Sequence, residues 1–106
     1  MYEGNVVLCG SSAYTRKYYL GEDFEGLPED VKQELQVMCV LFTEDVGGTL
    51  TLLFDEDGHL ELRTDADEED ILYDEIGSVL KVKQIQREKK DLLEALELYY
   101  ETFFMQ

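Results

Sequence analysis

Basic residues are scarce in this chain. Its 106 residues include 9 lysines and arginines against 25 aspartates and glutamates, so the formal net charge is −16. A surface with this charge repels nucleic acids and anionic membranes across a Debye length of about 10 Å. We therefore expect neither a nucleic acid nor a membrane as partner. The surplus of acids suits a highly soluble cytoplasmic protein, an acidic surface that docks on a basic partner, or an imitation of nucleic acid.

Cysteine and long apolar runs are also scarce. Cys9 and Cys39 lie thirty residues apart without a Cys-x-x-Cys motif, so we expect two small core residues in a reducing compartment. No run reaches the roughly eighteen apolar residues that a membrane-spanning helix requires. The apolar residues 6–8 are too few for a signal peptide. These absences predict a cytoplasmic protein.

The residue types that perform catalysis are scarce as well. His59 is the only histidine, and because no serine or cysteine stands near it in the sequence, we expect a solvated turn residue. Residues 55–58 fail as a calcium loop, since its first and last ligand positions would fall on Leu53 and Thr64. The acids between 65 and 75 could hold Mg²⁺, but no second acidic motif faces them. No catalytic residue, metal ligand or cofactor is therefore predicted.

The longest amphipathic pattern in the chain covers residues 67–104. Its apolar residues recur every three or four positions without an intervening proline, and Lys89 fills the one gap in the line. The pattern predicts a long helix with Asp65 or Asp67 as its N-cap. Gly77 disfavours a helix by about 1 kcal/mol relative to alanine, so we expect a kink or a break there.

A second amphipathic pattern covers residues 28–46. Pro28, the only proline, suits the first helical position, and two glycines at 47–48 suit the end of a helix. Near that end, residues 37–42 are apolar without a break. We therefore expect a helix that is buried on nearly all sides and lies at the centre of the core.

Residues 49–54 and 59–64 have the alternating pattern of a β-hairpin. A two-residue turn would scatter the apolar side chains over both faces. A three-residue loop with Gly58 in the left-handed conformation gathers them on one face, so we expect Phe54 to pair with Leu60. Since a lone hairpin is marginally stable, the N-terminus should add a strand or the helices should cover one face.

The N-terminal residues have the least decisive pattern. Between residues 13 and 20, a helix would place Tyr14 and Tyr18 on one face, whereas tyrosine prefers strands. Both alternatives remain open. The whole chain, residues 1–106, is expected to form one α+β domain. In it, two main helices, at about 28–46 and 67–104, pack on a small antiparallel sheet that contains the hairpin.

Two segments combine tyrosines with basic residues, a combination that anchors many protein interfaces. The candidate partner-binding residues are Tyr14, Arg16, Lys17, Tyr18, Tyr19, Lys89, Tyr99 and Tyr100. The alternative is that these tyrosines only cover the sheet or the long helix. The acidic start and basic middle of the long helix also suit antiparallel pairing of two copies about residue 79. A single copy could instead bury the same stripe against the helix at 28–46.

Three runs distributed along nearly the whole chain are LCGSSAYTRKYYL, LPEDVKQELQVMCVLFTEDVGGTL and DEIGSVLKVKQIQREKKDLLEALELYYETFF. These runs resemble a family of short acidic proteins of unknown function from anaerobic clostridia. The resemblance implies a bacterial cytosolic protein and supplies no catalytic residues. We therefore expect a non-enzymatic interaction or regulatory module. The alternatives are a small-ligand binder or enzyme with a carboxylate-bound metal, and an acidic imitation of nucleic acid.

Overall fold

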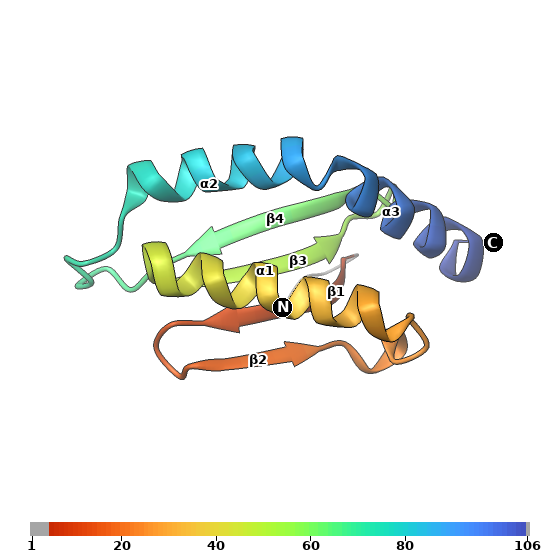
Figure 1. Ribbon diagram of the computed structural model, residues 1–106, viewed down its shortest axis with the longest axis horizontal. Coiled ribbons are helices and arrows are strands. Elements are labelled where there is room, and N and C mark those ends of the chain that lie inside the picture. Colours follow the sequence, from red (N-terminus) through yellow and green to blue (C-terminus); the bar gives the residue numbers. More distant parts are fainter. Residues whose placement is uncertain (1–4, 106) are drawn as a thin grey trace.

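The computed structural model describes residues 5–105 and joins a four-stranded antiparallel sheet to three α-helices (Figure 1). The elements follow in the order β1 (Val6–Ser12), β2 (Lys17–Leu20), the short 3-10 helix η1 (Glu22–Phe24), α1 (Glu29–Val46), β3 (Thr49–Phe54), β4 (Leu60–Asp65), α2 (Glu75–Glu88) and α3 (Lys90–Phe104). The α+β prediction is confirmed. Among the helices of residues 5–105, none has the length and apolarity to cross a membrane.

The strands lie in the order β2-β1-β3-β4, so the N-terminal segment adds two strands to the predicted hairpin. Residues 17–20 pair with β1, which decides the open alternative in favour of a strand. The hairpin register is the expected one, with Phe54 opposite Leu60. Gly58 has a φ of 85°, as the three-residue loop requires.

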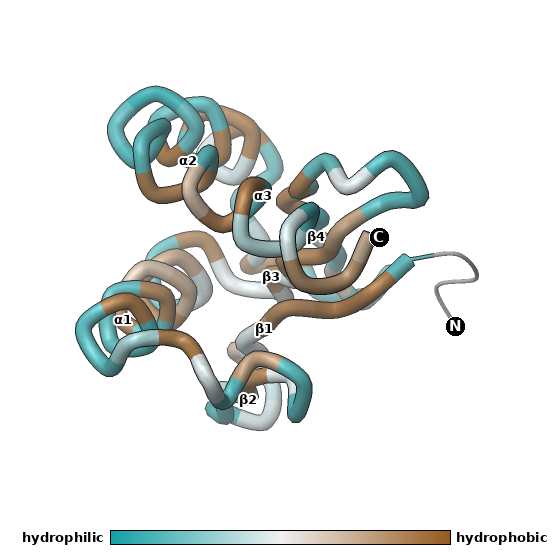
Figure 2. The backbone as a smooth tube through the Cα atoms, turned by 90° about the vertical axis from the view of Figure 1, so that its right-hand side faces the viewer, coloured by the Kyte–Doolittle hydropathy of each residue, from teal (hydrophilic) through white to brown (hydrophobic). Residues whose placement is uncertain are grey.

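One face of the sheet carries the core, and α1 crosses this face (Figures 1 and 2). Its six buried residues are Leu35, Met38, Cys39, Phe42, Thr43 and Val46. They lie against the buried side chains of Leu50, Leu52 and Phe54 on β3. As predicted, both cysteines are free and fully buried, and their sulfur atoms are 3.9 Å apart.

The expectation that α1 is buried on nearly all sides is wrong. Val37 and Leu41 are 57% and 58% exposed. The reason is the two-layer architecture, in which a helix has the sheet on one side only (Figure 2). The apolar run at 37–42 therefore contains more apolar side chains than the sheet can cover.

Helix α2 begins at Glu75 rather than at residue 67. Its N-cap is Asp74, whose carboxylate accepts the N–H of Gly77 at 2.7 Å, so the prediction of Asp65 or Asp67 is wrong. The predicted break at Gly77 is also wrong, because this residue lies in the first turn. A Cβ at Gly77 would come within 2.6 Å of the Asp74 carboxyl carbon, so glycine permits the cap.

The segment before α2 is held in a non-helical path by a distant tyrosine. The Tyr14 hydroxyl donates to the Asp70 carboxylate at 2.6 Å and accepts the N–H of Asp67 at 2.9 Å. The N–H of Asp74 binds the carbonyl oxygen of Val46, at the end of α1. These bonds give the N–H groups of Asp67 and Asp74 and the Asp70 carboxylate partners outside a helix, so the segment does not need to be helical to satisfy them.

The single long helix is instead two helices, and the break lies at Lys89. This residue has a φ of −106° and a ψ of 21°, and its ammonium binds the Glu34 carboxylate on α1 at 2.9 Å. Beyond it, α3 reaches the sheet, where the ring of Tyr100 stacks on Phe54 with centroids 4.1 Å apart. The one charged residue in the apolar line therefore marks the turn between the two helices.

Candidate functional site

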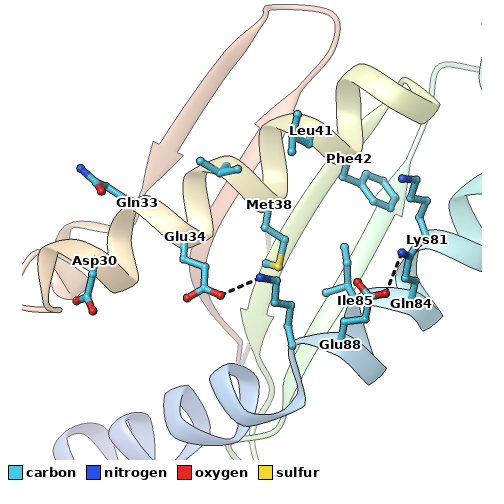
Figure 3. A pocket seen from close by; sticks show the side chains of 12 residues that line it. Asp30, Gln33, Glu34, Met38, Leu41, Phe42, Lys81, Gln84, Ile85 and Glu88 are labelled. Carbon is cyan, nitrogen blue, oxygen red and sulfur yellow. Dashed lines mark hydrogen bonds and ion pairs between the residues drawn. The ribbon is translucent and has the colours of Figure 1, made fainter.

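A groove of about 450 Å³ lies between α1 and α2 (Figure 3). Met38 and Phe42 of α1 and Ile85 of α2 point into it and form its apolar lining. Val37 and Leu41 also line the groove and, as described above, more than half of each side chain is exposed. Apolar surface gathered beside a groove is typical of a binding site.

The spacing of the sequence explains why these residues share one side of α1. Residues 34, 37, 38 and 41 are three or four positions apart, so their side chains lie on one face of the helix. The sheet takes up a neighbouring face, which contains Leu35 and Cys39. The signal that could have revealed the groove was the unbroken apolar run at 37–42, which is wider than one buried stripe.

Two ion pairs connect the helices that form the groove. The ammonium of Lys81 lies 2.7 Å from the carboxylate of Asp45, and Lys89 binds Glu34 as described. All four side chains are partly exposed, so each pair contributes at most about 1 kcal/mol. Within the part of the chain that the structure describes, these pairs leave Asp30 and Glu88 as groove carboxylates without a cation, so the groove retains negative charge.

Exposed apolar side chains also occur on the first half of α2 and on the loop before it. Five large ones are between 55% and 92% exposed, namely Ile71, Leu72, Ile76, Val79 and Leu80. On the helix, Val79 and Leu80 follow Ile76 by three and four positions, and we call these three residues the α2 patch. The patch is distinct from the groove, because α2 contributes Lys81, Gln84, Ile85 and Glu88 to the groove and none of the three.

The predicted partner-binding tyrosines of the N-terminus do not form one cluster. Tyr14 is bound to the loop before α2, as described above. Tyr18 and Tyr19 are neighbours on β2 and therefore point to opposite faces of the sheet. Tyr18 packs against the core, where burial raises the pKa of its phenol, whereas Tyr19 is half exposed on the other face.

The two basic residues between these tyrosines lie elsewhere. Arg16 and Lys17 line a second cavity of about 520 Å³, beside the C-terminal end of α1. Glu44 and Asp45 line the same cavity, so it contains charges of both signs. Arg16 has a φ of 55° in the turn between β1 and β2. Partner binding by these two residues stays a prediction.

The remaining predicted residues lie on or beside α3. Lys89 lines the groove and is the only one of the eight predicted residues that does so. Tyr100 is buried in the stack on Phe54, and burial raises the pKa of its phenol. Tyr99 is partly buried beside the core. Of the two tyrosines of α3, Tyr100 therefore offers a partner little surface.

A small group of polar side chains occupies the loop between β3 and β4. The ligand atoms of Asp55, Asp57 and His59 lie within 4.8 Å of one another. The Asp55 carboxylate accepts the N–H of His59 and that of Asp57, each at 2.9 Å, and these bonds hold its pKa below the usual range. Sequence reasoning considered the acids and the histidine separately. The hydrogen bonds of the turn account for their proximity.

The comparisons with known proteins identify a family and no individual relative. No curated protein and no solved structure matches it. A family model described as "Family of unknown function (DUF6145)" matches residues 5–106, which is nearly the whole chain. The match carries no activity or partner with it. The chain therefore belongs to DUF6145, a family of unknown function.

Proposed function

We propose that this protein is a non-enzymatic interaction module and that a protein partner binds in the groove between α1 and α2. The observation that carries the proposal is the exposure of Val37 and Leu41 directly beside an apolar groove. Full burial of such a side chain contributes about 1.5–3 kcal/mol, and because more than half of each is still exposed, a partner that covers them would recover roughly half of that for each. A regulatory role would follow from such binding.

The chemistry of the groove suggests the kind of segment that it binds. Met38, Phe42 and Ile85 suit apolar side chains, and the volume of about 450 Å³ is within the usual range of ligand pockets, roughly 300–1,000 Å³. The carboxylates of Asp30 and Glu88 suit a cation at the edge of such a segment. The net charge of −16 also accelerates the approach of a basic partner. We therefore propose a basic, amphipathic segment as the occupant.

The proposed setting is the cytoplasm of an anaerobic clostridium. Support comes from the three sequence runs that resemble the clostridial family and from the two free, buried thiols, which are typical of a reducing compartment. A fluorescent fusion expressed in the source organism tests the location. Signal confined to the cell envelope would contradict it.

Affinity capture with matched variants tests the groove. Leu41→Glu places a carboxylate beside the apolar lining, and Leu98→Glu adds the same charge on α3 at a side chain that is 64% exposed and outside the groove. A protein from the source organism should be enriched by the wild type and by Leu98→Glu, and lost with Leu41→Glu. Calorimetry with the purified partner should reproduce this order. A partner that Leu41→Glu retains would contradict the proposed groove.

The competing function is a metal-dependent one, for which the cluster of Asp55, Asp57 and His59 offers ligands. Titration calorimetry with Mg²⁺ and with Mn²⁺ distinguishes the two functions. Heat of binding that disappears in Asp55→Asn would favour the metal site. Titrations without heat in the wild type would dismiss it and leave the interaction module as the better account.

A further inference from the structure

The outward face of α2 has an apolar half and a basic half. Ile76, Leu80, Lys83 and Arg87 follow one another at intervals of four, three and four residues, so they form one stripe along the helix. Lys90 follows at the start of α3. At about 1.5 Å per residue, the 14 residues of α2 extend over roughly 20 Å. The stripe is thus long enough for a helix-to-helix contact.

The basic half of this stripe is unpaired. Five of the chain's nine basic residues lie between 81 and 90, and two of them, Lys81 and Lys89, bind carboxylates of α1. Within residues 5–105, no ion pair involves Lys83, Arg87 or Lys90. Three unpaired cations are unexpected in a chain with 25 acids. Lys83 and Arg87 lie on the outward stripe, and Lys90 follows it at the start of α3.

The opposite charge lies on the other side of the α2 patch. Residues 65–75 contain seven acids and no base. Among the described residues, Glu68, Glu69 and Glu75 have no ion pair, whereas Asp70 and Asp74 bind Tyr14 and the start of α2. Along the chain, the exposed apolar patch is therefore flanked by an acidic segment before it and a basic segment after it.

We infer that the α2 patch binds the α2 patch of a second copy of this chain, with the two α2 helices antiparallel. A uniformly basic partner would be repelled by Lys83 and Arg87, and a uniformly acidic one by residues 65–75. A second copy in the antiparallel orientation places its acidic segment beside the basic end of α2 and its basic end beside the acidic segment. With the two-fold axis near Val79 and Leu80, Arg87 of each copy approaches the acidic loop of the other.

The pairing leaves the groove between α1 and α2 free. Its lining residues on α2 lie on another face of the helix from Ile76 and Leu80. The inference therefore does not depend on the proposed function. The sequence predicted antiparallel pairing along one helix at 67–104. In the structure, the contact would instead involve the shorter helix α2, because α2 begins at Glu75 and the acids before it lie in a loop.

Sedimentation velocity and light scattering at physiological salt test the inference, over micromolar to millimolar concentrations. The wild type should rise from 12.3 kDa towards twice that mass. Leu80→Glu should raise the dimer dissociation constant by more than about tenfold, because a carboxylate would be buried without a partner. Leu98→Glu should leave it unchanged. It is the matched control, since both leucines are similarly exposed, at 62% and 64%, and gain the same charge.

Charge reversal tests the orientation. Arg87→Glu and Glu69→Lys should each weaken self-association, because each opposes like charges in an antiparallel dimer. A mixture of the two variants should form a heterodimer more tightly than either variant alone associates. A mixture that associates no better would overturn the antiparallel arrangement.

Three outcomes separate this inference from the proposed function. A wild type that is monomeric at every concentration overturns the dimer, as does a dimer that Leu80→Glu leaves intact. If the dimer is overturned in either way and the wild type still captures a partner that Leu41→Glu loses, the proposed function stands. A dimeric protein whose captured partner is retained by Leu41→Glu supports the dimer and contradicts the groove.

Discussion

Helices α1 and α2 both have amphipathic sequences, but they have different relations to the sheet. Six side chains of α1 are buried, whereas Ser78 is the only buried residue of α2. Figure 2 shows both helices on the same side of the strands, and α1 contacts β1, β2 and β3 there. The comparison shows that an apolar stripe is fully buried only where a sheet faces it.

The two helices are consequently held by different forces. Each buried aliphatic or aromatic side chain of α1 contributes about 1.5–3 kcal/mol. Helix α2 depends on its cap at Asp74, on ion pairs with α1 and on the partly buried Val82 and Ile85. We conclude that α1 supports the fold, while α2 retains exposed apolar surface.

Truncating one aliphatic side chain in each helix should give the largest difference in stability between variants of α1 and variants of α2. Leu35→Ala on α1, at a fully buried position, should lower the free energy of unfolding by about 2–5 kcal/mol. Ile85→Ala on α2, which is partly buried, should lower it by roughly 1–2 kcal/mol, since less apolar area is lost. Urea denaturation of both variants provides the measurement. Equal losses would show that α2 is as firmly packed as α1.

The cap of α2 should have the next largest effect. Asp74→Ala removes the acceptor for the N–H of Gly77 and should cost about 1 kcal/mol. Hydrogen exchange should show the loss of protection in the first turn of α2, with the amides of α1 unchanged. Glu75→Ala is the neighbouring control and should change little. A uniform loss of protection over both helices would mean that they unfold as one unit.

The ion pair between the helices should have the smallest effect. A double-mutant cycle with Lys81→Gln and Asp45→Asn should give a coupling energy of about 0.2–1 kcal/mol, because both side chains are partly exposed. The coupling should decrease at high salt. A coupling well above this range would show that α2 is attached mainly by charge.

Local patterns predicted the parts of the fold that depend on near neighbours. The hairpin register followed from alternation, since a shift by one residue would have turned Leu52 and Phe54 away from the core. The end of α1 followed from its two glycines. Residues 17–20 stayed undecided because their spacing suits either element, and only pairing with β1, a tertiary contact, distinguishes them.

Other features depend on residues far apart in the sequence. The start of α2 was misplaced because the bond from Tyr14 to Asp70 spans 56 positions, and the break at Lys89 was missed because its bond to Glu34 spans 55. The groove depends on how α1 and α2 lie against each other. The apolar run at 37–42 signalled excess apolar surface, but not the element that would lie beside it.

The strand order has a consequence for synthesis. Strand β1, one of the two inner strands, leaves the ribosome first and can pair at once with β2, whereas β3 follows only after all of α1. One edge of β1 therefore stays open while the longest helix of the chain is made, and such an edge invites pairing with other nascent chains. Because α1 precedes β3, it is available to shield the apolar face of that first hairpin. Helix α2 emerges when all four strands are already present.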